Sequence, residues 1–167
     1  MPELVPKERL QPSLLDRLTD EEPGNPQESR ERRVLSPQRL REVVRRDLGW
    51  LFNAINLASV EDLSAYPQVA RSVLNYGLPD LTGRTASGMD PPQLERMLRQ
   101  VVKDFEPRIL PGSIRVKLVV DEAKMGHNAM VFDIEGELWA QPLPIRLYLR
   151  TELDLEVGAI QVSDRGG

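Results

Sequence analysis

Apolar residues recur at helical spacing in two long segments of the chain. Ser36 and Pro37 precede the first set of apolar positions, which are Leu40, Val43, Val44, Leu48, Leu51 and Phe52. Asp90 and Pro91 precede the second set, which is Leu94, Met97, Leu98, Val101, Val102 and Phe105. A capping side chain followed by proline is typical of a helix start, and the spacing is typical of a helix packed on a core. We therefore predict two amphipathic helices, the second ending at Glu106 because the residue before a proline avoids helical geometry.

From residue 113 onward the apolar period changes to two, which is typical of strands with one buried face. The pattern predicts strands at 114–120, 129–138 and 145–157, with a hairpin turn across 122–128 where glycine and asparagine occur. The last run is the most regular, and its charged side chains, including Glu152 and Asp154, share the face opposite the leucines. Helices followed by a strand meander indicate an α+β fold, with N-terminal helices packed on one face of a small, mainly antiparallel C-terminal sheet.

The remaining segments define the expected domain boundaries. Residues 1–35 read as a flexible N-terminal arm, because a charged stretch rich in proline and glycine follows one short helix that carries Leu14, Leu15 and Leu18. We expect a single α+β domain over 36–163 and a disordered tail over 164–167. A second short helix is expected at 66–77, ending at Gly77. The arginines at 39, 41, 45 and 46 are interpreted as a solvated helix face.

Composition removes several classes of function. The net charge of −4 does not favour nucleic acid or an anionic membrane as a partner, and the absence of cysteine removes disulfides, thiol catalysis and cysteine zinc sites. The N-terminus lacks the pattern of a signal peptide, and no apolar run approaches the roughly 20 residues that span a bilayer. We expect a soluble protein kept inside the cell, with no membrane insertion and no cofactor.

Catalytic candidates are few. His127 is the only histidine and falls in the expected hairpin turn, where we interpret it as a solvated turn residue. Four carboxylates could be proposed as a glycosidase pair, namely Glu106, Glu122, Asp133 and Glu152. Most acidic residues, however, fall on the strand face expected to meet water. Because no motif requires catalysis, the protein is expected not to be an enzyme.

The stretch "DFEPRILPG" at 104–112 places Glu106, Pro107 and Arg108 together between the second long helix and the first strand. These residues have two interpretations. The charged pair could fasten the turn locally, which contributes about 0–1 kcal/mol when it is exposed. Alternatively, the arginine could bind a partner's carboxylate or carbonyl groups from a turn that proline stiffens. The residues alone leave both interpretations open.

Four segments occur in an order that resembles a known family: "PSLLDRLTD", "SVLNYGLPDLTG", "FEPRI" and "LRTELDLEVG". The chain resembles TssE, the small baseplate subunit of the bacterial type VI secretion system, which is related to the wedge protein of contractile phage tails. The resemblance covers nearly the whole chain. It implies a structural subunit of a cytoplasmic baseplate docked beneath the inner-membrane complex, where tube and sheath polymerise.

The resemblance also implies partners and site residues. The implied partners are the wedge subunits TssF and TssG, the sheath subunits TssB and TssC, and other baseplate components such as TssK. Glu106, Pro107 and Arg108 match the family's Glu-Pro-Arg motif, which is associated with contacts in the baseplate core and toward the sheath.

Two further hypotheses join the resemblance to the residue pattern. The long strand at 145–157, with Glu152 and Asp154 on its exposed face, could accept a sheath strand at its edge, and Leu14, Leu15 and Leu18 could form a second docking element. The alternatives are a lysozyme-like hydrolase acting on peptidoglycan, since phage relatives carry that label, and a wedge subunit of another contractile particle.

Overall fold

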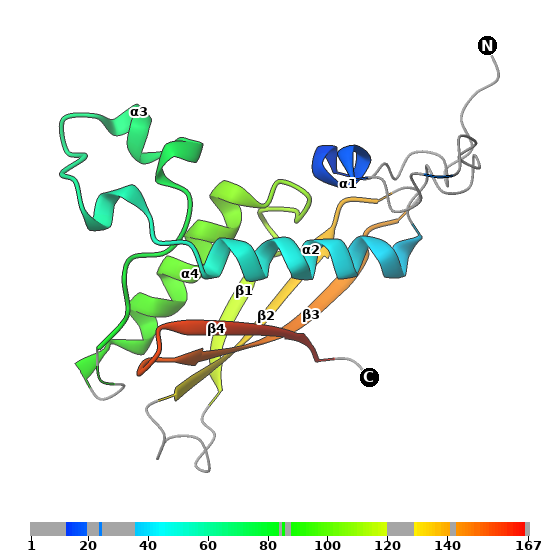
Figure 1. Ribbon diagram of the computed structural model, residues 1–167. Coiled ribbons are helices and arrows are strands. Elements are labelled where there is room, and N and C mark those ends of the chain that lie inside the picture. The colour runs from blue at the N-terminus through cyan, green and yellow to red at the C-terminus, as the bar shows by residue number, and fades with distance from the viewer. Residues whose placement is uncertain are drawn as a thin grey trace.

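Helices α2 and α4 cover one face of a small sheet in the computed structural model (Figure 1). The structure describes residues 13–19, 24, 36–83, 85, 88–119, 129–140 and 143–165. The expected hairpin turn, His127 and Glu122 lie outside the described residues. Helix α2 spans Pro37–Phe52 and helix α4 spans Pro91–Phe105, which confirms the two predicted amphipathic helices.

The helix ends follow from local chemistry. The hydroxyl oxygen of Ser36 accepts a hydrogen bond from the backbone N of Arg39 at 3.1 Å, so it caps α2 as predicted. The side chain of Asp90 makes no capping hydrogen bond at the start of α4. The predicted helix in the N-terminal arm is α1, Leu14–Leu18. The helix expected at 66–77 is instead two short pieces, α3 at Pro67–Ala70 and the 3₁₀ helix η4 at Val73–Asn75, preceded by η3 at Leu57–Ser59.

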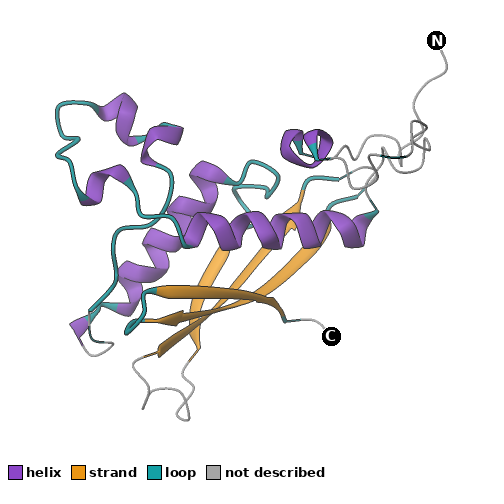
Figure 2. Cartoon of the chain, viewed as in Figure 1, coloured by secondary structure: helices purple, strands orange, loops and turns teal. Residues whose placement is uncertain are grey.

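The sheet has four antiparallel strands in the order β1-β2-β3-β4. They are β1 (Arg115–Val119), β2 (Ala129–Leu138), β3 (Ile145–Asp154) and β4 (Ala159–Asp164). All the long helices precede the strands along the chain, and the predicted α+β architecture is confirmed (Figure 2). The core lies between the helices and the sheet, where the largest fully buried side chains include Leu48, Val102, Phe132, Ile134, Leu147 and Leu149.

The predicted free edge strand at 145–157 is wrong in two respects. Strand β3 ends at Asp154, because a turn with Gly158 in the left-handed region (φ +73°) reverses the chain into β4. Strand β3 is also an interior strand, paired with β2 along its whole length and with β4 over 149–154. Only its first part, 145–148, lacks a β4 residue opposite it. Alternating charge along a strand predicts that one of its faces is polar, but it does not predict which strands lie beside it.

Side chains of the helices cap backbone groups at both edges of the sheet. At β4, the amide of Asn53 accepts from the backbone N of Ile160 at 2.9 Å and donates to its carbonyl oxygen at 2.8 Å. At β1, a carboxylate oxygen of Glu95 accepts from the backbone N of Leu118 at 2.7 Å. These bonds satisfy edge groups that would otherwise be free to pair with another strand.

Candidate functional site

The turn that follows α4 is fixed on both sides by backbone hydrogen bonds. The carbonyl of Arg108 accepts from the backbone N of Trp139 at 2.7 Å, and Leu110 N donates to the carbonyl of Glu137 at 2.8 Å. Ile109, between them, is buried in the core. The Glu-Pro-Arg turn therefore follows α4 and is hydrogen-bonded to the end of β2. Of its three residues, Pro107 is the exposed one.

Glu106 and Arg108 form a bidentate ion pair around a buried carboxylate. Arg108 donates from Nε to Glu106 Oε1 at 2.7 Å and from Nη2 to Oε2 at 2.5 Å, and its backbone N donates to Oε1 at 3.1 Å. Glu106 is only 3% exposed. The local ion pair considered from the sequence is thus present, but it is not the exposed kind that contributes little, because a buried carboxylate depends on its partner.

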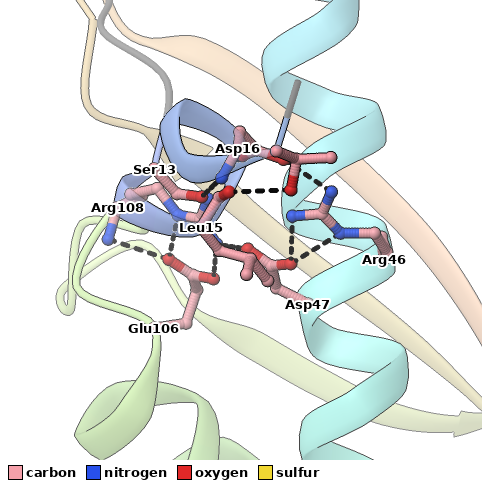
Figure 3. A network of polar contacts seen from close by, with 8 residues as sticks. Ser13, Leu15, Asp16, Arg46, Asp47, Glu106 and Arg108 are labelled. Atoms are coloured by element: carbon pink, nitrogen blue, oxygen red, sulfur yellow. Dashed lines mark hydrogen bonds and ion pairs between the residues drawn. The ribbon is translucent and has the colours of Figure 1, made fainter. Parts of the chain in front are cut away.

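The pair is one end of a longer charge chain, which we define as Glu106, Arg108, Asp47, Arg46 and Asp16 (Figure 3). Arg108 Nη2 reaches Asp47 Oδ2 at 2.6 Å, and Asp47 Oδ1 accepts from Arg46 Nη2 at 2.7 Å. Arg46 Nη1 then pairs with Asp16 Oδ1 on α1 at 2.6 Å. The chain alternates acid and base, so it ties the turn to α2 and α2 to α1.

The pKa values along the charge chain respond to these contacts. Burial by itself would lower the pKa of Arg108, but hydrogen bonds and charge from Glu106 and Asp47 outweigh burial and raise it. Hydrogen bonding to Asp16 is the largest cause that raises the pKa of Arg46. Burial opposes ionisation of Asp16, yet its bonds with Arg46 and Ser13 hold the pKa of Asp16 below the ordinary value. These contacts therefore favour the charged forms of Asp16, Arg46 and Arg108.

A pocket of about 410 Å³ opens beside the charge chain and includes Asp47, Glu106 and Arg108 in its lining. Its apolar lining comes from four segments of the chain and consists of Leu15, Trp50, Leu51, Tyr76, Phe105 and Pro107. Arg46 covers the face of the Trp50 ring at 4.7 Å from the ring centroid. Within the part of the chain that the structure describes, Arg108 Nη1 is buried and has no hydrogen-bond acceptor.

Helix α1 and its N-cap residue lie against this pocket. Ser13 and Leu15 line the pocket, and Asp16 makes the ion pair with Arg46. The leucines remain accessible: Leu14 is 70% exposed, Leu15 50% and Leu18 74%. An apolar row that stays exposed on a docked helix is typical of a surface that meets another chain.

Residues 38–143, more than half of the chain, match the family model described as baseplate wedge protein gp25. The chain belongs to this family. Comparisons with curated proteins and with solved structures found no match. Membership of the wedge family means that the chain is a structural component of a phage-tail-like baseplate and that it contacts other baseplate components.

The region matched to the wedge family contains the turn at 106–108, Arg46 and Asp47 of α2, and the aromatic pocket lining, whereas α1, β3 and β4 lie outside it. Among the described residues, no helix is both long and apolar enough to cross a bilayer. The same residues hold no group of three or more histidine or carboxylate side chains arranged for a metal ion.

Two predicted contact residues of this wedge protein lie far from the turn. The turn is joined to the Leu138 end of β2, and Leu138 pairs with Ile145 at the start of β3. Glu152 lies seven residues further along β3, or roughly 24 Å at the rise of an antiparallel strand. The structure therefore separates Glu152 and Asp154 from Glu106, Pro107 and Arg108.

Two of the carboxylates considered for catalysis, Glu106 and Asp133, are each held by arginine side chains. Glu106 is bound by Arg108, while Asp133 is bound by Arg150 at 3.2 Å and by Arg165 at 2.6 Å. The prediction that Asp133 faces water is wrong: Asp133 is 8% exposed, because β2 is central and long basic side chains from other segments reach over it.

Sequence reasoning missed Asp16, Arg46, Asp47, Trp50 and Tyr76. The arginines of α2 were interpreted as a solvated face, yet Arg46 links α1 to Asp47, and Arg41 and Arg45 donate to backbone carbonyls of the sheet. One signal in the sequence for this ion-pair network is Asp47, an acidic residue next to the arginines on the polar face of an amphipathic helix.

Proposed function

We propose that this wedge-family protein is the TssE-type subunit of a type VI secretion baseplate, where it links the wedge subunits to the contractile sheath. Family membership supports the baseplate role, and the four segments that resemble TssE support the type VI assignment. In this proposal the protein works in the cytoplasm, in a baseplate docked beneath the inner-membrane complex. Its direct partners are TssF and TssG, its sheath neighbours are TssB and TssC, and TssK belongs to the same assembly.

The observation that carries the proposal is the rigid Glu-Pro-Arg turn at the mouth of an apolar pocket. Three hydrogen bonds from Arg108 hold the buried carboxylate of Glu106, and two backbone bonds fix the turn to the sheet. A loop already ordered in the free protein loses little conformational entropy when it binds a partner. The exposed Pro107 and the aromatic pocket lining give that partner an apolar contact area.

Leu14, Leu15 and Leu18 form the second proposed contact with the wedge partners. All three are at least half exposed, and Leu15 lines the same pocket. Replacing Leu14 and Leu18 by serine removes apolar contact area without touching the ion pair of Asp16. We expect this double variant to bind TssF and TssG more weakly while its stability is unchanged, as measured by titration and by thermal unfolding.

Contact with the sheath is proposed to use strand addition, but the structure narrows where a strand could pair. Asn53 caps Ile160 on β4, and Glu95 caps Leu118 on β1. Strand β3 is interior except at 145–148, where Arg41 and Arg165 already donate to the carbonyl oxygens of Arg146 and Tyr148. Charge reversals at Glu152 and Asp154 test whether the outer face of β3 takes part. If sheath polymerisation is normal in these variants, this part of the proposal fails.

The first experiment is co-purification with TssF and TssG of full-length wild type and of Glu106→Ala, Pro107→Ala and Arg108→Ala. Circular dichroism of each variant shows whether it folds, and Lys103→Ala, on the exposed side of the last turn of α4, is the matched control. The proposal expects wild type and the control to enter the complex, and at least one folded turn variant to be lost from it.

Failure of wild type to bind TssF and TssG would remove the type VI assignment and leave the wedge family alone. The runner-up is then a wedge subunit of another contractile particle, which the family match supports equally well. Normal entry of all folded turn variants would instead reduce Glu106 and Arg108 to a structural pair.

A further inference from the structure

Among the described residues, helix α1 is held on the domain by an ion pair and by one side chain in the pocket. Its five residues are too few for a helix that persists in water by itself, so its folding depends on docking. Docking uses the ion pair of Asp16 with Arg46 and the contact of Leu15 with the pocket. The side chain of Asp16 is only 15% exposed in that pair, whereas Leu14 and Leu18 gain almost no burial.

The place that α1 occupies adjoins the proposed partner contact. We define the α1 site as Arg46, Asp47, Trp50, Tyr76 and the turn 106–108. The carboxylate side chain of Glu106 is 4% exposed and the side chain of Arg108 is 27% exposed. Glu106 and Arg108 line the pocket, so a partner that enters the pocket meets this turn, and Ser13 and Leu15 supply part of the same lining.

The charged groups of the α1 site indicate which ligand chemistry fits it. Without α1, it contains two guanidinium groups, of Arg46 and Arg108, and two carboxylates, of Asp47 and Glu106, so its charge is balanced. In the free protein α1 adds one carboxylate, opposite Arg46, and one leucine side chain in the pocket. Arg108 Nη1, buried without an acceptor among the described residues, is a further donor in this site.

We infer that α1 is an internal placeholder for the wedge partner, an inference that rests on the proposed function. The partner presents a short apolar segment that carries one carboxylate: an aliphatic side chain replaces Leu15, and the carboxylate replaces Asp16 at Arg46. Binding displaces α1 and frees Leu15, so that it joins the already exposed Leu14 and Leu18 in contact with the partner. The ion pair of Asp16 with Arg46 therefore reduces the apparent affinity for the partner, because only the α1-released fraction of the protein is competent to bind.

The test compares two variants that both break the same ion pair in the full-length chain. Asp16→Asn releases α1 but keeps Arg46 for the partner, so binding to the purified TssF–TssG complex becomes about threefold to tenfold tighter. Arg46→Gln releases α1 and also removes the cation, so binding becomes about tenfold weaker or worse. Arg39→Gln, a substitution on the exposed part of α2, is the control and leaves the affinity unchanged.

Opposite signs for Asp16→Asn and Arg46→Gln support the inference, and a shared sign overturns it. Tighter binding of both variants would mean that α1 only covers the site and that the partner needs no carboxylate there. Weaker binding of both would make docked α1 a permanent part of the interface.

A second measurement keeps the α1 site testable if the TssF–TssG assignment fails. The full-length Leu15→Ser/Asp16→Asn variant, with Trp139→Phe so that Trp50 is the single tryptophan, is titrated with a peptide of residues 11–20, QPSLLDRLTD. A saturable change in Trp50 fluorescence that is lost when the peptide carries Asp16→Asn supports the inference. No change, or the same change with both peptides, overturns it.

Discussion

Truncating Arg108 tests how much of the fold depends on the buried carboxylate of Glu106. In Arg108→Ala, Glu106 loses the bonds from Nε and Nη2 at 2.7 and 2.5 Å and keeps the one from the backbone N at 3.1 Å. Breaking a buried ion pair by removing one partner costs about 3–5 kcal/mol. Because the backbone bond remains and Asp47 retains Arg46, we expect the lower end, about 3 kcal/mol.

Urea unfolding followed by circular dichroism measures this loss, and thermal unfolding should show a midpoint lower by about 6–12 °C for a domain of this size. The matched control is Arg39→Ala, which removes an exposed pair with Glu42 in the same protein. That pair has side chains 52% and 40% exposed, so its loss should cost less than about 1 kcal/mol.

Two results would contradict this reasoning. If Arg108→Ala lowers the free energy of unfolding by no more than Arg39→Ala does, the pair of Glu106 with Arg108 contributes as little as an exposed pair. The burial of Glu106 then has no effect on stability. The double variant Glu106→Gln/Arg108→Met leaves no unpaired charge, so it should be more stable than Arg108→Ala alone. If it is less stable, the cost comes from lost packing rather than from a stranded carboxylate.

Three further predictions concern the backbone, the α1 contact and the sheet edge. Gly77→Ala should lower the free energy of unfolding, measured in urea, by more than about 2 kcal/mol. The reason is that φ is +117° and a Cβ would lie 2.2 Å from the backbone oxygen of Ala54. Gly83→Ala, with φ +74° and open space around its Cβ position, should cost only about 1 kcal/mol. The pKa of Asp16 is lowered in the folded chain, so its stabilisation is complete above the ordinary value of 3.8 and is lost as the pH falls below it. The stability difference between wild type and Asp16→Asn should therefore be constant near neutral pH and shrink below that value. Asn53→Ala should destabilise the fold by about 1–3 kcal/mol and speed amide hydrogen exchange at Ile160, which loses its acceptor.

Hydrophobic period alone determined most of the elements of this protein. The positions of α2, α4 and three strands follow from which residues share a face, since that depends only on neighbours a few places along the chain. The same local information located the turn at 106–108, because proline ends a helix whatever surrounds it. It also indicated an ion pair there, since Glu106 and Arg108 are only two residues apart.

Tertiary structure determined which of those elements contact one another and which side chains pair. Asp47 meets Arg108 across 61 positions in the sequence and Arg46 meets Asp16 across 30, so the charge chain exists only after α1, α2 and the turn have packed. Asp133 is buried because basic side chains from β3 and from Arg165 converge on it, although its strand parity predicted exposure. Strand β3 became interior when Gly158 turned the chain back into β4. Periodicity assigns a residue to a face, whereas burial, charge partners and strand neighbours depend on which segments pack against that face.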